Sequence, residues 1–270
     1  MDNLVIITIF LTLFSFGASV ISAIVGMGGG VLLLAGMYTV LPDMTLVLPL
    51  HACVSLISNF TRVLAYLKSV NWKIFGYFTI GGIPGLMAGS FLLQELWDMR
   101  DVATPYMMIL VGCFILFITH YKSTKAKNDR PLSRFILLGT YAAPISLIFG
   151  ANGAVIAPYF MRKDLQRDEV VATEAIIQFS VHFFKIGIFY ALWKMGTGEG
   201  ISKYADISDS GIMVLSLVLA AIVGTFWGKH LNNKVSEQFF KKIFMIVLNL
   251  AALKILLLDG VWTLISQETS

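Results

Sequence analysis

Residues 26–37 read GMGGGVLLLAGM and place four glycines within five positions at the end of a long apolar run. Glycine weakens a helix, so this stretch should interrupt one inside an otherwise apolar region. A helix that breaks inside a bilayer leaves peptide N–H groups without partners, and these are tolerated only where protein or a water-filled cavity receives them. The stretch therefore predicts a glycine tip that faces a buried polar site.

The whole chain has the composition of a membrane protein. Of its 270 residues, 57% are hydrophobic and only 13% are charged, and the mean hydropathy is +0.80. These values favour an all-α polytopic membrane protein over a soluble domain. The net charge of +4 does not indicate nucleic acid, because Lys and Arg gather between apolar runs, where basic loops orient helices. We therefore predict no nucleic-acid partner, no cofactor and no metal site.

Several apolar runs are long enough to cross the hydrocarbon core, which takes about 20 helical residues. They are 4–25, 46–67, 72–93, 104–121, 170–194, 211–228 and 241–258. Shorter apolar runs remain at 30–41, 135–149 and 151–161. These shorter runs predict re-entrant or broken hairpins, which enter and leave on one side of the membrane around a glycine-containing tip.

The charged loops predict the orientation of the chain, because cytoplasmic loops collect Lys and Arg. The basic loops 122–134 and 229–242 should lie inside, and the acidic segments 94–103 and 195–210 should lie outside. This orientation puts the N- and C-termini on the outer side. It also opens the first hairpin to the outside and the second, residues 131–169, to the inside.

The same order of elements thus occurs twice with opposite sidedness, and weak internal similarity supports a repeat. At an offset of 123 residues Gly30 aligns with Gly153. Glycine pairs at a spacing that favours helix packing in membranes also recur, as Gly85 with Gly89 and Gly224 with Gly228. We predict two inverted-topology repeats, 1–125 and 130–270, each with a glycine-tipped broken hairpin and three transmembrane helices. Together they would form one transmembrane domain.

Polar side chains follow each hairpin at helical spacing. They are His51, Ser55, Ser58 and Arg62 in the first half, and Glu174, Gln178, His182 and Lys185 in the second. An Arg or Lys at the centre of a membrane helix costs about 2.5–3.5 kcal/mol on insertion scales, so such stripes usually face a cavity. We predict that Arg62 and Lys185, which are repeat equivalents, bracket one anion near the midplane. The alternative is that each cation snorkels to the nearer membrane surface.

The predicted substrate-binding residues come from the two tips and the two stripes. They are Gly28, Gly29, Gly30, Asn59, Arg62, Asn152, Gly153, Gln178, His182 and Lys185. Each tip precedes a helix N-terminus, whose N–H groups and partial positive charge suit an anion. The alternative is that the glycines serve only tight helix crossing.

His51 and Glu174 are the candidate proton carriers, because an imidazole and a carboxylate can each take up and release a proton. They are also repeat equivalents. The alternative is a histidine of the core and a carboxylate that is paired with a base such as Arg167.

With its glycine tip, its two similar halves and its length, the chain resembles the sulfite exporter TauE/SafE family. The family's hallmark is a GxGGG tip followed shortly by proline, once in each half. Here the first copy reads GMGGGVLLLAG, with Ala35 at the proline position. The second reads FGANGAVIAP, which keeps Pro158 and replaces the triple glycine with Ala151, Asn152 and Gly153. The resemblance spans nearly the whole chain and implies transport of sulfur oxyanions or organosulfonates across a bacterial or archaeal inner membrane.

We therefore expect an alternating-access secondary transporter that exports a small sulfur-containing anion such as sulfite or an organosulfonate. Moving a negative charge out of a negative interior gains about 2.3 kcal/mol per 100 mV, so export needs no coupling ion. The alternatives are a carrier or channel for another small anion, with or without proton-coupled uptake, and a carrier for a cation or neutral solute. An intramembrane enzyme is less favoured, because neither HExxH nor GxSxG occurs. The expected partners are the substrate and the lipid bilayer, with a homodimer left open.

Overall fold

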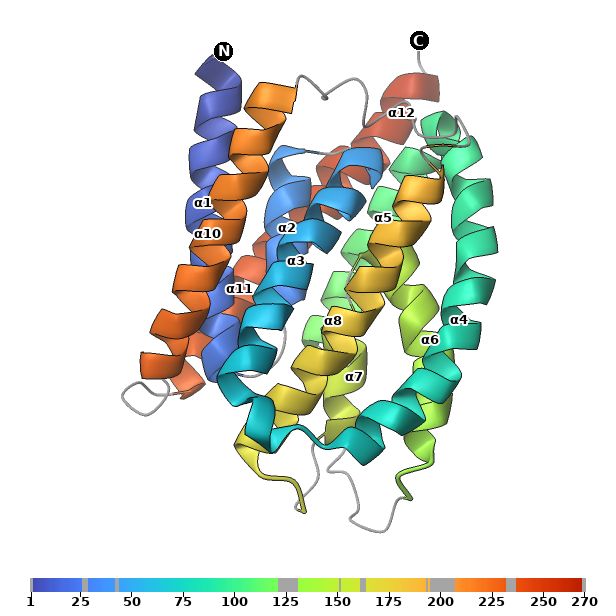
Figure 1. The fold of residues 1–270 in the computed structure, drawn as a ribbon. Helices are drawn as coiled ribbons and strands as arrows, with labels where there is room; N and C mark the ends of the chain where they lie inside the picture. Colours follow the sequence, from blue (N-terminus) through green and yellow to red (C-terminus); the bar gives the residue numbers. More distant parts are fainter. Residues whose placement is uncertain are drawn as a thin grey trace.

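The computed structural model describes residues 2–25, 29–41, 44–120, 131–150, 152–160, 164–192, 194, 207–231 and 237–268. Within these segments the chain is almost entirely helical (Figure 1). The first half contains α1 (Asp2–Val25), α2 (Gly29–Val40), α3 (Met44–Tyr66), the short 3-10 helix η1 (Leu67–Ser69), α4 (Trp72–Asp98) and α5 (Arg100–His120). The second half contains α6 (Arg134–Phe149), α7 (Gly153–Phe160), α8 (Arg167–Leu192), α10 (Ile207–Leu231), α11 (Glu237–Lys254), the π-helix η3 (Ile255–Trp262) and α12 (Thr263–Glu268).

These helices confirm the prediction of an all-α polytopic membrane protein. Among the described residues, six helical segments are long and apolar enough to cross a membrane. They are Leu4–Ile24, Leu46–Ser69, Trp72–Asp98, Asp168–Leu192, Gly211–Leu231 and Met245–Ser266. The predicted span 104–121 forms α5, whose apolar part among the described residues is Val102–Phe117, so α5 is not one of the six. The three short runs form the separate helices α2, α6 and α7, as expected.

The two hairpins open towards opposite ends of the helical bundle. In Figure 1, α1 begins and α2 ends at the upper end, whereas α6 begins and α7 ends in the lower half. Both chain termini lie at the upper end as well. Opposed hairpins are what an inverted repeat requires. The repeat itself and its orientation in a membrane stay predictions.

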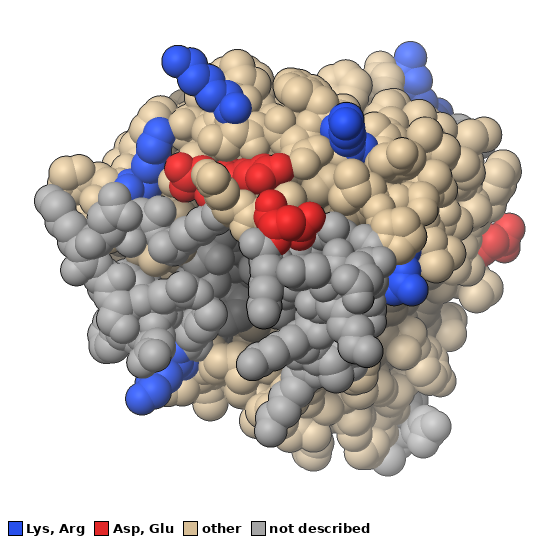
Figure 2. Space-filling view, turned by 90° about the horizontal axis from the view of Figure 1, so that it is seen from below, with Lys and Arg blue, Asp and Glu red and all other residues tan. Residues whose placement is uncertain are grey.

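The lower end of the bundle, where α3 turns into α4, is seen face-on in Figure 2. Lys and Arg side chains lie around its margin, and a small group of acidic side chains lies nearer the centre. Of the predicted basic loops, residues 122–130 and 232–236 lie outside the described residues, whereas 229–231 end α10 and 237–242 begin α11, so the second loop is shorter than predicted. The turn between α3 and α4 carries Lys68 and Lys73, both exposed. That this end of the bundle faces the cytoplasm stays a prediction from the sequence.

Long helices of the two halves pack against each other through glycine. Helix α1 lies along α10, and α4 lies along α6. A Cβ added at Gly85 of α4 would lie 2.6 Å from the carbonyl oxygen of Thr140 on α6. A Cβ added at Gly228 of α10 would lie 2.6 Å from the carbonyl oxygen of Val20 on α1. The predicted packing role of the two glycine pairs is confirmed, and each half supplies helices that pack against the other.

Replacing Gly85 by alanine is expected to destabilise the folded protein by about 1–3 kcal/mol, the range typical of overpacking. The added methyl group would press on the backbone of α6, which cannot move away as a flexible side chain can. Gly76→Ala is the matched control on the same helix, because a Cβ at Gly76 meets nothing within 4 Å. Thermal unfolding in detergent, followed by tryptophan fluorescence, measures both variants. Equal midpoints for the two would show that the contact between α4 and α6 does not need glycine.

The centre of the bundle is the pair of helices α3 and α8, which run antiparallel. Helix α2 packs on α3 and helix α7 packs on α8, and the two short helices also contact each other. Because α2 and α7 each begin just after a glycine tip, their N-terminal ends are held inside the bundle rather than at its surface. The fold therefore brings both tips next to the two helices that carry the polar stripes.

Candidate functional site

Both polar stripes face the interior of the bundle, as predicted. Their buried members are His51, Ser55, Ser58, Asn59 and Arg62 on α3, and Glu174, Gln178, His182 and Lys185 on α8. The side chain of Arg62 is 5% exposed and that of Lys185 is fully buried. Neither side chain therefore reaches the surface of the bundle, as the snorkelling alternative would require.

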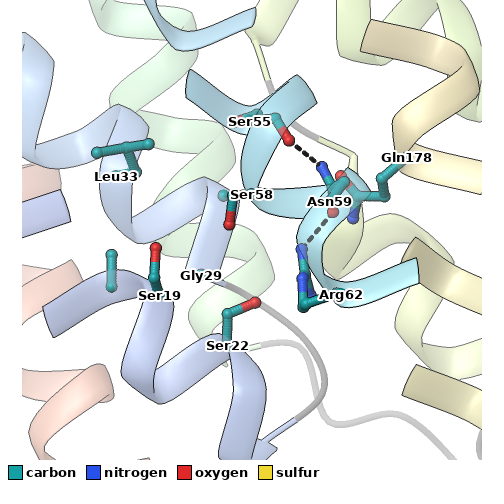
Figure 3. Close-up of a pocket in the computed structure, with 11 residues that line it drawn as sticks. Ser19, Ser22, Gly29, Leu33, Ser55, Ser58, Asn59, Arg62 and Gln178 are labelled. Carbon is teal, nitrogen blue, oxygen red and sulfur yellow. Dashed lines mark hydrogen bonds between the residues drawn. The ribbon is translucent and has the colours of Figure 1, made fainter. Parts of the chain in front are cut away.

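A polar cavity lies between α1, the start of α2, α3 and α8 (Figure 3). It holds about 300 Å³ of empty space, including its open mouth. Its lining consists of Ala18, Ser19, Ser22, Gly29, Gly30, Leu33, Ser55, Ser58, Asn59, Arg62 and Gln178. Four hydroxyl groups, two amides and one guanidinium thus surround this space. No carboxylate belongs to this lining.

Arg62 is held in the cavity by a chain of hydrogen bonds along α3. Its guanidinium donates to Oδ1 of Asn59, and Nδ2 of Asn59 donates to the carbonyl oxygen of Ser55 over 2.7 Å (Figure 3). The hydroxyl of Ser55 lies 3.1 Å from Nε2 of His51, and the same nitrogen lies 2.9 Å from the carbonyl oxygen of Gly30. This series of hydrogen bonds connects the guanidinium of Arg62 to the backbone of the first tip, so the side chain and the tip move together.

Two polar groups of the cavity lack hydrogen-bond partners among the described residues. They are Oγ of Ser22 and Nε of Arg62. A buried donor without a partner carries a desolvation penalty of about 1–3 kcal/mol, and more when it is charged. Both groups can donate a hydrogen bond, so a bound anion would satisfy them together.

The first glycine tip supports the site in two ways. Helix α2 begins at Gly29, and Gly29 and Gly30 line the cavity, so the helix start with its free N–H groups lies at the cavity wall. Gly29 also packs tightly on α1, because an added Cβ would lie 2.7 Å from the carbonyl oxygen of Ala18. The alternative role in helix crossing therefore holds for Gly29 in addition to its place in the lining. Gly28 lies outside the described residues.

The second tip is buried but does not belong to this cavity. Nδ2 of Asn152 donates to the carbonyl oxygen of Ala142 over 3.3 Å, and the backbone carbonyl of Asn152 accepts from the first turn of α7. Gly153 begins α7 and is buried as well. The structure therefore places Asn152 and Gly153 as the start of a helix, apart from the residues that surround Arg62.

Lys185 binds the end of a helix. Its ammonium donates to the carbonyl oxygens of Ser146 and Gly150 over 2.8 and 2.9 Å, at the C-terminus of α6. A cation is favourable there, because it pairs with unsatisfied carbonyls and with the negative end of the helix dipole. Beside it, the rings of His51 and His182 lie with their centroids 5.4 Å apart. Lys185 and His182 thus form a second buried cluster with His51, outside the cavity lining.

Glu174 lies behind the cavity wall. Nε2 of Gln178 donates to Oε1 of Glu174 over 3.2 Å, and Gln178 itself lines the cavity. The carboxylate interacts electrostatically with Arg62 and is 1% exposed, and its Oε2 has no hydrogen-bond partner among the described residues. The side chain of Arg167, the alternative partner for Glu174, lies outside the described residues.

Two cavity residues, Ser19 and Ser22 of α1, were not predicted from the sequence. Figure 3 shows them on the side of the cavity opposite Asn59 and Gln178. With Ser15, whose hydroxyl donates to the carbonyl oxygen of Leu217 over 2.9 Å, they recur at steps of four and three in an otherwise apolar helix. This helical spacing of hydroxyl groups was the available signal.

The described residues offer no metal site, because no group of three His, Cys, Asp or Glu side chains is arranged to hold an ion. What the arrangement can do is bind an anion by hydrogen bonds from hydroxyls, amides and a guanidinium. Membrane-length helices packed around such a buried polar cavity are typical of a membrane transport protein.

The family follows from a comparison of the sequence. The sequence model of the Sulfite exporter TauE/SafE family matches residues 11–255, nearly the whole chain, so the protein belongs to this family. Membership confirms the resemblance and implies a multi-pass membrane transporter of the sulfite-exporter type. Comparisons with curated proteins and with solved structures found no match.

Proposed function

We propose that the protein is a secondary transporter that exports a small sulfur-containing anion, such as sulfite or an organosulfonate, by alternating access. The observation that carries this proposal is the cavity at the start of α2, where Nε of Arg62 and Oγ of Ser22 have no hydrogen-bond partner in the part of the chain that the structure describes. Planar guanidinium groups match the oxygens of oxyanions well, and the start of a helix adds further donors. The family supports a sulfur oxyanion as the cargo.

The expected direction of transport is out of the cell, across the inner membrane. Both chain termini are expected on the outer side of that membrane. An anion that leaves a negative interior gains about 2.3 kcal/mol per elementary charge and 100 mV, so the membrane potential alone can drive export. His51 and Glu174 are the proposed proton carriers if the same protein works in uptake, where a coupling ion is needed. Their support is that both are buried and that both adjoin the cavity wall, His51 through Ser55 and Glu174 through Gln178.

Reconstitution in liposomes tests this proposal. Charge movement on a solid-supported membrane is recorded after addition of sulfite, thiosulfate, methanesulfonate, taurine or chloride, with protein-free liposomes as the baseline. We expect currents for the sulfur oxyanions and none above the baseline for chloride. Counterflow, in which external unlabelled substrate accelerates the efflux of labelled substrate, is expected from a carrier and not from a channel. Folded protein that is silent to every sulfur oxyanion would contradict the proposal.

A further inference from the structure

We propose that the buried charges of this site select an anion with one net negative charge, and that Glu174 sets this selectivity. The inference rests on the proposed function, because it concerns the charge of the anion that the same cavity holds. It names the substrate class more narrowly than the family does. Organic sulfonates and hydrogensulfite carry one negative charge, whereas sulfate and fully ionised sulfite carry two.

The first step is an inventory of buried charge. Among the side chains that the structure describes, three Lys, Arg, Asp or Glu residues are buried: Arg62, Glu174 and Lys185. Two cations and one carboxylate leave a formal sum of one positive charge when the imidazoles are neutral. Lys254 and Asp259 lie apart and cancel each other in an ion pair of 2.6 Å.

The second step is that this sum does not depend on where one proton resides. A proton that passes from Lys185 to Glu174 removes one positive and one negative charge and leaves the total unchanged. Arg62 keeps its charge in either arrangement, because a guanidinium is not deprotonated in proteins. The buried set is therefore neutralised by a single negative charge from the ligand.

The third step is that Glu174 acts on the cavity through two lining residues, Gln178 and Arg62. Its Oε1 accepts from Gln178, which lines the cavity, and its charge attracts Arg62. A ligand with one negative charge brings the charge sum over Arg62, Glu174 and Lys185 to zero. A second negative charge would stay uncompensated near the carboxylate, and buried uncompensated charge is strongly unfavourable. Removal of the carboxylate charge should therefore make room for a dianion.

The test compares two anions of similar size and chemistry but different charge. Methanesulfonate carries one negative charge and sulfate carries two at neutral pH. Isothermal titration calorimetry measures their affinities for wild type, for Glu174→Gln and for the control Glu169→Gln. Glu169 lies on the same helix and accepts from Nδ2 of Asn71, so its substitution removes an equal charge outside the buried set. Glutamine keeps the acceptor that Gln178 needs at position 174.

We expect wild type to bind methanesulfonate at least tenfold more tightly than sulfate. Glu174→Gln is expected to lower this ratio at least tenfold, and Glu169→Gln to leave it unchanged. Equal affinities in wild type, or an unchanged ratio in folded Glu174→Gln, would overturn the inference while the proposed function stands. If neither anion binds folded wild type, the proposed function fails as well. If Glu174→Gln does not fold, the ratio of the methanesulfonate and sulfate affinities in wild type alone decides whether the inference holds.

Discussion

Replacement of Arg62 by glutamine is expected to weaken anion binding by thirtyfold or more and to remove anion-driven currents from reconstituted liposomes. Among the described residues, Arg62 is the one cation in the cavity lining, and its Nε has no hydrogen-bond partner. Truncating one partner of a buried charged hydrogen bond typically costs about 2–5 kcal/mol. Calorimetry with methanesulfonate and currents from liposomes measure the two effects separately.

The controls for this prediction separate the loss of the ligand group from a loss of the fold. Arg134→Gln removes the same charge at the exposed start of α6 and should behave like wild type. Arg62→Gln alone leaves Glu174 without its opposite charge, so the double variant with Glu174→Gln is expected to regain thermal stability but not anion binding. Full currents in folded Arg62→Gln would show that the anion binds elsewhere.

Replacement of Lys185 by methionine is expected to destabilise the protein by about 3 kcal/mol and to weaken anion binding by the folded fraction less than Arg62→Gln does, because it removes a buried charge but no group of the cavity lining. A hydrogen bond to a charged group contributes about 1.5–3 kcal/mol, and two carbonyls at the end of α6 would lose this donor. Methionine keeps most of the buried volume, so the loss reports the ammonium group. The thermal midpoint and methanesulfonate calorimetry are the two measurements.

The same pair of measurements decides between two roles for Lys185. The sequence predicts that it binds the anion together with Arg62, whereas its contacts are those of a group that ends a helix. If Lys185→Met loses anion binding while its thermal midpoint stays unchanged, the role of Lys185 is to bind the anion. Lys194→Met, at an exposed position two residues after the end of α8, is the control and should alter neither quantity.

The sequence predicted the membrane class, the short helices and the inward direction of both stripes, because these depend on patterns along the chain. A charge such as Arg62 within an apolar run leaves few arrangements that avoid lipid. Helical spacing then fixes which neighbours share its face, and this brought Ser55 and Ser58 into the correct group. The start of α2 was predictable for a similar reason, since the run of glycines there disfavours helix.

What could not be predicted depends on contacts between distant segments. Ser19 and Ser22 resemble ordinary core residues of a membrane helix, since a hydroxyl can bond to its own helix backbone and lowers hydropathy little. The partners of Lys185 are backbone carbonyls at the end of α6, and every helix end offers such groups. Nothing in the sequence distinguishes this end from the others.

The exchange of packing partners between the halves bears on how the protein is made and how it can move. During synthesis the glycine face of α4 has no packing partner until α6 is made, and α1 has none until α10 is made. Neither half of the sequence therefore has a complete interior until the chain is finished. A rocking motion that keeps the glycine contacts would carry α1 with α10 and α4 with α6. The moving bodies would then be composites of both halves, and the boundary between them would pass between α3 and α8, where the cavity lies.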